Sequence, residues 1–242
     1  MNAVMVIPFR SDDTGYRQRN LEFVLKFYSA KKFCDIVVVE QSALPTALAL
    51  SGARHIHLPD AGSFNRSRCR NTGVRQSPET PWIIWSDGDV IHPHLESRMP
   101  ADSSAPMFIN PKNVMLDLSD QQTRHLIQTG DTSGRSPTRL GVCGASGLCI
   151  LNRKTFEITG GMDERFLGWG GEDDAFDCLC QTLGGISCFS TNDRIYHLWH
   201  PRDRNSLIHD EHQYRKNLDL VNDCRRDVRQ YQRDRGVALV GN

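Results

Sequence analysis

Apolar residues of this 242-residue chain gather in short runs that alternate with segments of helical character. Three runs, one ending at Pro8, one at Asp35–Glu40 and one starting at Trp82, are too short for an average helix and are typical of buried strands. Residues 21–32 and 66–76, which lie between these runs, are typical of helices. The alternation predicts an α/β fold.

The rest of the chain is less regular. Periodicity weakens over residues 101–140, and residues 130–139 are rich in Gly, Ser, Thr and Pro, which predicts a loop. Such a loop either shapes a substrate site or simply connects two elements. Residues 148–151 form another apolar run. Residues 211–235 show a charged helical pattern whose apolar stripe is expected to pack against the domain, through Tyr214, Leu218, Val221, Val228 and Tyr231.

The most informative polar feature is the segment Trp169-Gly-Gly-Glu-Asp-Asp174, directly before an apolar helical pattern. Its two glycines permit a sharp turn, and its three acids would then occupy the first turn of a helix, where carboxylates are well tolerated. Three acids beside a large aromatic face predict a site at the mouth of a cleft. An N-capped surface helix is the alternative, but it explains only one or two of the acids.

Two further clusters suit a divalent cation. The strand that begins at Trp82 ends in Asp87-Gly-Asp89, where glycine allows two carboxylates to face one ion; an ordinary turn is the alternative. His197 and His200 lie three residues apart before Pro201, and at this spacing both can reach one metal, although a structural role is also open. Together the clusters predict a site for Mg²⁺ or Mn²⁺.

Composition narrows the function classes. A formal net charge of zero removes any general case for a nucleic-acid binder. The eight cysteines include no C-x-x-C pair and are interpreted as reduced core thiols of a cytosolic protein. Because the chain has no apolar run long enough to span a bilayer and no signal peptide, we expect a cytoplasmic protein without a membrane span. Its length fits a single domain over residues 1–242.

In their order along the chain, these segments resemble those of metal-dependent glycosyltransferases with the GT-A fold. The motifs are most similar to those of the β-1,4-galactosyltransferase group and of the catalytic modules of bacterial chondroitin-type polymerases. The resemblance covers residues 4 to about 205 and implies a Rossmann-like mixed central sheet flanked by helices. It is carried by Ile7–Arg10, Phe64–Arg66 with Asn71 and Gly73, Ser86–Asp89, Gly168–Asp174, and His200–Asp203 with Asn205.

The resemblance also implies a division of the chain and a role for each motif residue. Residues 1–95 would be the nucleotide-binding half, residues 140–205 the acceptor-binding and catalytic half, and residues 206–242 a C-terminal helical segment. Asp173 would be the general base, and Ala145 and Ser146 would lie near the donor sugar. Donor-binding residues would be Pro8, Phe9, Arg10, Phe64, Arg66, Asp87 and Gly88; acceptor or sugar contacts would be Trp169, Gly171, Glu172 and Asp174; metal ligands would be Asp89, His197 and His200.

The implied reaction is transfer of a hexose or N-acetylhexosamine from a UDP-sugar, with UDP-galactose or UDP-N-acetylgalactosamine favoured. Asp173 would take the proton of an acceptor hydroxyl, on a glycan, a protein or a modified nucleobase, with inversion at the anomeric carbon. The alternatives are a retaining transferase, a non-catalytic sugar-nucleotide or glycan-binding module, and a phosphotransferase or nucleotidyltransferase. Since the animal galactosyltransferases are membrane-anchored, we expect a bacterial or phage origin.

Overall fold

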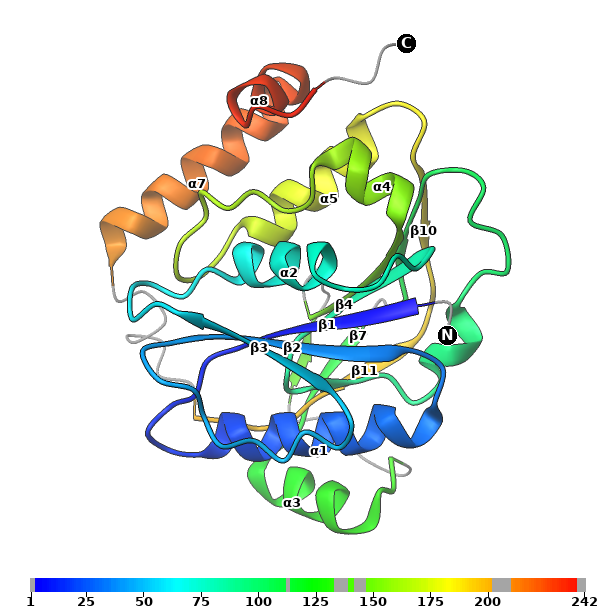
Figure 1. Ribbon diagram of the computed structural model, residues 1–242, viewed down its shortest axis with the longest axis vertical. Coiled ribbons are helices and arrows are strands. Elements are labelled where there is room, and N and C mark those ends of the chain that lie inside the picture. The colour runs from blue at the N-terminus through cyan, green and yellow to red at the C-terminus, as the bar shows by residue number, and fades with distance from the viewer. Residues whose placement is uncertain (1–2, 112–113, 133–138, 142–146, 202–209, 239–242) are drawn as a thin grey trace.

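A mixed sheet lies at the centre of the computed structural model, which describes residues 3–111, 114–132, 139–141, 147–201 and 210–238 (Figure 1). Among these residues the sheet has seven strands, in the order β10 (Ser187–Ser190), β6 (Met107–Asn110), β9 (Leu148–Asn152), β4 (Trp82–Ser86), β1 (Ala3–Phe9), β2 (Asp35–Ser42) and β3 (Arg54–Pro59). Neighbouring strands are parallel except at β9, which runs antiparallel to both β4 and β6. The α/β prediction is therefore confirmed.

Helices cover both faces of the sheet (Figure 1). The helix α1 (Tyr16–Lys31) packs on one face, and α2 (Arg66–Arg75), α4 (Arg153–Thr159) and α5 (Glu172–Thr182) pack on the other. Every residue of β1 and β4 is buried, because parallel strands covered on both faces have no solvent-exposed side. This double burial explains why these two strands are continuous apolar runs.

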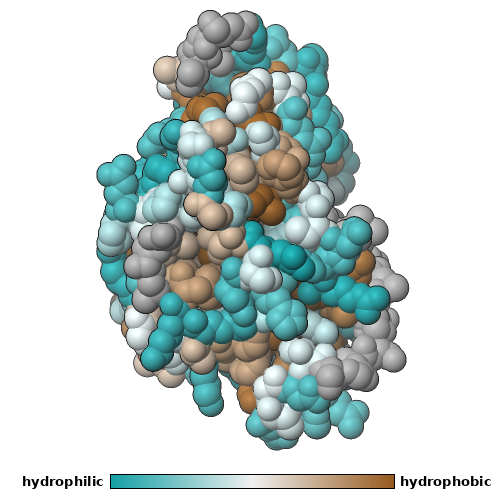
Figure 2. Space-filling view, turned by 90° about the vertical axis from the view of Figure 1, so that its right-hand side faces the viewer, coloured by the Kyte–Doolittle hydropathy of each residue, from teal (hydrophilic) through white to brown (hydrophobic). Residues whose placement is uncertain are grey.

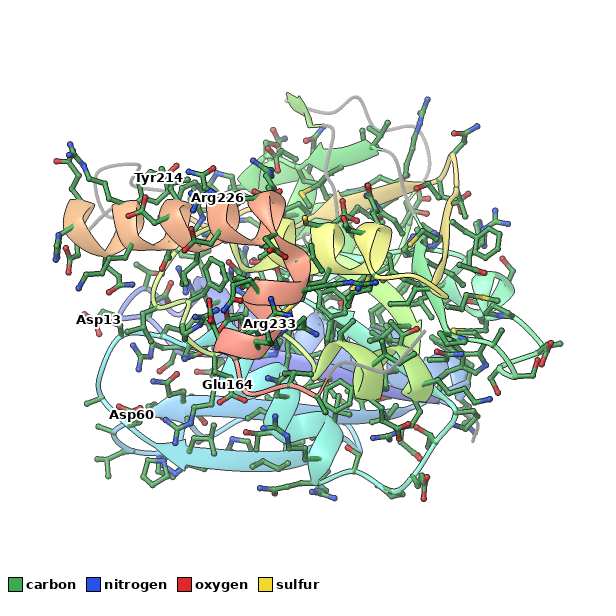
Figure 3. The ribbon with its side chains drawn as sticks, turned by 90° about the horizontal axis from the view of Figure 1, so that it is seen from above. Asp13, Asp60, Glu164, Tyr214, Arg226 and Arg233 are labelled. Atoms are coloured by element: carbon green, nitrogen blue, oxygen red, sulfur yellow. The ribbon has the colours of Figure 1, made fainter. Side chains whose placement is uncertain are left out.

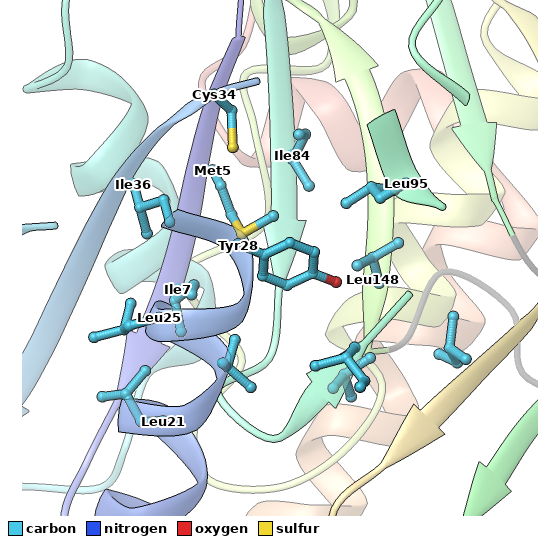
Figure 4. Packing of buried hydrophobic residues seen from close by; sticks show 14 of the residues in the cluster. Met5, Ile7, Leu21, Leu25, Tyr28, Cys34, Ile36, Ile84, Leu95 and Leu148 are labelled. Atoms are coloured by element: carbon cyan, nitrogen blue, oxygen red, sulfur yellow. The ribbon is translucent and has the colours of Figure 1, made fainter. Parts of the chain in front are cut away.

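The side chains of β1 alternate between two hydrophobic cores. Met5 belongs to the core beneath α1, whereas Val6 belongs to the core on the opposite face. Figure 4 shows the first core, in which Leu21 and Tyr28 of α1 lie over the strands. In the second core α2 comes very close to the sheet, since a Cβ on Gly73 would lie 2.3 Å from Cγ1 of Val6.

A smaller sheet lies beside the main one. Its described strands follow the order β5 (Val90–Ile91), β11 (Arg194–His197), β7 (Val114–Asp117) and β8 (Arg139–Gly141). The helix α3 (Asp120–Thr129) and a short 3₁₀-helix (Leu95–Arg98) follow β7 and β5. Near the C-terminus, α7 (Glu211–Arg226) and α8 (Val228–Asp234) pack against α5. A third apolar cluster fills this contact, and it includes Phe166, Leu179, Val221 and Tyr231.

Several element boundaries differ from those predicted. The first helix begins at Tyr16 instead of residue 21, because Gly15 adopts a left-handed conformation that turns the chain into the helix. The pattern over residues 211–235 is two helices, which separate at Asp227; the Asp227 side chain caps α8 by accepting a hydrogen bond from the backbone N–H of Gln230 at 3.0 Å. Residues 101–140 contain β6, β7 and α3, which the sequence did not predict.

Surface properties agree in part with expectation. On the face shown in Figure 2, hydrophilic residues predominate and hydrophobic ones are interspersed among them. None of the described helices combines the length and the apolar character that crossing a membrane requires. Most described cysteines are buried, as predicted for core thiols, whereas Cys188 is exposed and Cys178 is half-buried. These two thiols are therefore exceptions to the predicted burial.

Candidate active site

A cleft of about 750 Å³ opens at the carboxyl ends of β1 and β4. Every described residue that the sequence predicted for the donor, metal, acceptor and catalytic sites lines this one cleft. Six further lining residues were not predicted: Arg17, Met115, Gly147, Gly170, Tyr214 and Leu218. The motifs, which are separated by up to about 190 residues along the chain, therefore meet in one place, while the role of each residue stays a prediction.

Strand pairing brings the predicted metal ligands together. Asp89 directly precedes β5, and β5 pairs antiparallel with β11 so that Val90 lies opposite His197. The backbone N–H of Leu198 extends the pairing by donating to the carbonyl of Asp89 at 2.7 Å. His197 ends β11 and His200 follows three residues later, so both imidazoles lie beside the Asp89 carboxylate.

The three side chains offer one donor atom each, all within 4.8 Å of one another. Nε2 of His197 lies 3.5 Å and Nε2 of His200 lies 3.4 Å from the carboxylate oxygens of Asp89. Burial opposes the charge on Asp89, but the two histidines together with Arg17 and Arg66 outweigh it and lower the pKa of this carboxyl. An oxygen donor with two imidazole nitrogens fits a divalent cation such as Mn²⁺, and nucleotide phosphates could complete its coordination.

Asp117 contacts one of the predicted metal ligands. It lies at the end of β7, which runs parallel to β11 and pairs His197 with Asp117. Its Oδ1 is 3.5 Å from Nδ1 of His197, the ring nitrogen that does not face Asp89. A carboxylate in this position orients a ligating imidazole and increases its basicity. No sequence pattern indicates this contact, because it depends on the register of two distant strands.

At the predicted nucleotide side of the cleft, Arg10 connects the end of β2 to the loop that carries Phe64. Its Nε donates to the carbonyl of Gln41 at 2.8 Å and its Nη2 to that of Asp60 at 3.1 Å. The guanidinium also lies over the Phe64 ring, 5.5 Å from the ring centroid, within the range of a cation–π contact. Arg10 therefore positions the Phe64 ring, in addition to the phosphate contact predicted for it.

Two arginines of α2 contact the Asp-Gly-Asp motif, and one of them also contacts the acidic helix. Arg70 is almost fully buried and donates from Nη2 to Oδ1 of Asp87 at 2.7 Å. Arg66 forms an ion pair with Glu172, and its Nε lies 4.0 Å from Oδ1 of Asp87. Burial opposes the charge of Arg66, but Glu172 and Asp87 raise its pKa. The buried Glu172 is thus held by an arginine, and Arg66 joins the two halves of the cleft.

Asp173 lies at the start of α5, at the edge of the same cleft. Its Oδ1 accepts a hydrogen bond from the backbone N–H of Asp174 at 3.1 Å. Burial, together with the neighbouring carboxylates of Glu172 and Asp174, raises the pKa of Asp173 to about 6. A carboxylate with this pKa is a stronger base than an ordinary aspartate and is still ionised at neutral pH.

Comparison with known proteins agrees with this arrangement. Residues 135–179, which end inside α5, match the family described as the N-terminal domain of galactosyltransferase. No curated protein sequence matches the chain. The catalytic domain of Drosophila β1,4-galactosyltransferase 7, solved with xylobiose, superposes with a TM-score of 0.50 at 19% identity, covering 82% of this chain and 71% of that one. Another structure of the Drosophila enzyme contains manganese, UDP-Gal and xylobiose.

Other solved transferases share the fold at low identity. GalNAc-T7, solved with UDP, GalNAc and Mn²⁺, superposes with a TM-score of 0.58 at 12% identity, covering 98% of this chain and 55% of that one. Residues 1–349 of S. aureus TarS, solved with UDP-GlcNAc, give a TM-score of 0.53 at 16% identity, covering 85% of this chain and 61% of that one. This chain has the GT-A fold. The resemblance inferred from the motifs is therefore confirmed for the architecture.

In this GT-A domain, α7 supports the loop that carries the acidic motif. Asn217 is buried and donates from Nδ2 to the backbone carbonyls of Leu167 and Trp169, at 2.9 and 3.2 Å. The ring of Tyr214 stacks on that of Trp169, with 5.7 Å between centroids, and Figure 3 shows Tyr214 near the start of α7. A Cβ on Gly171, whose φ is 96°, would lie 2.9 Å from Val221. The close fit requires glycine at this position.

The predicted apolar stripe of α7 is therefore only partly a packing face. Val221 is buried in the third cluster, as expected. Leu218 has 41% of its surface exposed and lines the cleft with Tyr214, beside the 43%-exposed Trp169. The sequence predicted that Leu218 and Tyr214 would both pack against the domain. Helical periodicity could not separate core from cleft, because an open cleft also presents an apolar wall to one face of the helix.

Replacing Asn217 with alanine should loosen the Trp169 loop without touching the reacting groups. Two backbone carbonyls would lose their hydrogen-bond donor, so we expect the free energy of unfolding to fall by about 1–3 kcal/mol. We also expect kcat to fall, because Asp173 follows this loop. Thermal unfolding and steady-state kinetics would measure both effects. Replacing the exposed Asn192 with alanine is the control; equal losses of kcat in the two variants would contradict a role of Asn217 in the loop.

Three predicted features lie outside the described residues. They are Ala145 and Ser146, the segment following Pro201 through Asn205, and most of the loop predicted over residues 130–139. The proximity of Ala145 and Ser146 to the donor sugar therefore remains a prediction, and the two alternatives for the loop stay open.

Proposed function

We propose that this protein is a divalent-metal-dependent, inverting glycosyltransferase that transfers a hexose or N-acetylhexosamine from a UDP-sugar to an acceptor hydroxyl. One observation carries the proposal: the cation-binding triad of Asp89, His197 and His200 lines the same cleft as Asp173, a carboxylate suited to general base catalysis. The fold adds support, since one transferase that shares it was solved with manganese and UDP-Gal and another with UDP, GalNAc and Mn²⁺.

Each side of the cleft has a distinct part in the proposed reaction. Phe64 would offer an aromatic face to the base of the nucleotide, and Asp87, which accepts a hydrogen bond from Arg70, would contact the ribose. Asp89, His197 and His200 would hold Mn²⁺ or Mg²⁺, which when bound neutralises charge on the diphosphate. The exposed ring of Trp169 offers an apolar surface to a pyranose of the acceptor.

Asp173 would perform the proton transfer. Its carboxylate accepts the proton of the acceptor hydroxyl while that oxygen forms a bond to the anomeric carbon, and the bond from this carbon to the diphosphate breaks to release UDP. Attack from the face opposite the leaving group inverts the configuration. Glu172 is engaged with Arg66 and Asp174 is exposed, which leaves Asp173 as the acid of the motif best placed for this role.

A donor screen tests the proposal. The purified protein with Mn²⁺ would be incubated with UDP-, GDP- and ADP-linked sugars, and release of free nucleotide by slow hydrolysis would be measured. We expect metal-dependent release of UDP from one UDP-hexose or UDP-N-acetylhexosamine, which also identifies the donor sugar for an acceptor search. Absence of both turnover and binding for every nucleotide sugar would contradict the proposal. Once an acceptor is known, NMR of the product anomer would distinguish inversion from retention.

The rate should depend on the protonation of Asp173. Its pKa is raised from 3.8 to about 6, so the carboxylate that can accept a proton is the main form above pH 6 and is lost as the pH falls through that value. We expect kcat/KM for the acceptor to decrease by about tenfold for each pH unit below this point, because this ratio reports the pKa of the base before the acceptor binds. A pH profile of this kcat/KM at saturating donor and metal would measure it. A profile that stays flat down to pH 5 would contradict the assignment of Asp173 as the base.

A further inference from the structure

The arginines that line the described part of the cleft differ in the hydrogen bonds and ion pairs that they form within the protein. Arg10 donates to two backbone carbonyls, and Arg66 lies between two carboxylates. Arg17 has a looser contact: its ion-pair partner among the described residues is Asp12, with 3.6 Å between Nε and the carboxylate oxygen. This distance is too long for a good hydrogen bond. The Arg17 side chain is 40% exposed and faces the cleft, so its donors are accessible to a ligand.

The first turn of α1 fixes Arg17 close to the metal triad. The ring of Tyr16 packs edge-on against that of Trp199, with 4.9 Å between centroids, and Nη2 of Arg19 donates to the backbone carbonyl of Trp199 at 2.9 Å. Trp199 directly precedes the metal ligand His200. Residues on both sides of Arg17 are therefore attached to the segment that carries a metal ligand, which places Arg17 on the cleft wall next to the triad.

A nucleotide bound at the triad would still carry negative charge that a cationic side chain could neutralise. A nucleoside diphosphate bound to a divalent cation keeps a net negative charge, and within the described cleft the charge of Arg66 is offset by Glu172 and Asp87. Arginine binds phosphate oxygens well, because its planar guanidinium donates two parallel, charge-assisted hydrogen bonds. We propose that Arg17 binds the diphosphate of the nucleotide donor beside the metal triad. This inference rests on the proposed function, because it requires a nucleoside diphosphate in the cleft.

The effect of Arg17 on diphosphate binding can be separated from its effect on binding of the nucleoside part. Calorimetry would measure the binding of UDP in the presence of Mn²⁺, and competition would measure the binding of uridine, which lacks both phosphates. In the Arg17→Ala variant we expect UDP to bind about tenfold more weakly or worse, while uridine binding changes less than twofold. Arg17→Lys should recover part of the UDP affinity, because a lysine keeps the charge but loses the paired donors.

Arg75→Ala is the matched control, since Arg75 on α2 also forms an exposed ion pair, at 3.0 Å from Glu164, but does not line the cleft. It should leave both affinities unchanged, and thermal unfolding would establish that all variants are folded. If Arg17→Ala weakened the binding of UDP and of uridine equally, or weakened neither, the role of Arg17 would be overturned. The proposed function would remain intact. If the unaltered protein binds no nucleoside diphosphate, the proposed function fails and this inference fails with it.

Discussion

Replacing Asp173 with asparagine should lower kcat by about 10²- to 10⁴-fold, the range that a positioned general base contributes. Asparagine has nearly the same shape, and its amide oxygen can still accept the hydrogen bond that Asp174 donates to Asp173. It cannot accept a proton at neutral pH. Binding of UDP and Mn²⁺ should change little, because the triad and Phe64 belong to other elements of the cleft. Steady-state transfer kinetics and calorimetry on the same preparation would separate the two effects.

Asp174→Asn is the matched control for this prediction. Asp174 is the next residue on the first turn of α5, lines the same cleft and is exposed. Removing its charge should cost far less activity than the change at Asp173, although a modest fall in the pKa of Asp173 is expected because one neighbouring negative charge is lost. If the Asp174 variant lost as much kcat as the Asp173 variant, the base would have to be reassigned or shared between the two acids.

The sequence was a good guide where local chemistry determines structure. The apolar run that begins at Trp82 and stops at Asp87 could be assigned as a buried strand ending in a site, because burial on both faces leaves a continuous apolar signature. The acids after Gly171 could be placed on the first turn of a helix for a similarly local reason. Both features lie where they were predicted, at the edge of one cleft.

The sequence was a poor guide where the site depends on pairing between distant segments. Asp117 contacts His197 only because β7 and β11 are adjacent and in a particular register, and β7 consists of four residues with no distinctive pattern. The ion pair of Arg66 with Glu172 joins residues 106 positions apart, and no spacing rule anticipates it. Sequence reasoning identified the residue types of the site, but the contacts that hold them in position required the folded chain.

Replacing Asp89 with alanine should abolish high-affinity binding of Mn²⁺ and, with it, transfer. Asp89 is the sole carboxylate of the triad, so the variant leaves two neutral imidazoles facing a dication without a compensating negative charge. His200→Ala removes one neutral ligand and should weaken Mn²⁺ binding less than Asp89→Ala does. Asp117→Asn leaves all three donor atoms in place and should cost about 10- to 100-fold in metal affinity, the range seen when the partner of a ligating histidine is removed.

Calorimetric titration of each variant with Mn²⁺, with and without UDP, would test this order of effects. His125→Ala is the control, because His125 is an exposed histidine on α3 that does not line the cleft. The order of the effects on Mn²⁺ affinity is the informative result. Asp89→Ala should weaken Mn²⁺ binding most, His200→Ala less, and Asp117→Asn least. Unchanged Mn²⁺ affinity in Asp89→Ala would mean that the cation binds elsewhere, and the triad would then be an ordinary hydrogen-bonded cluster at the junction of β5 and β11.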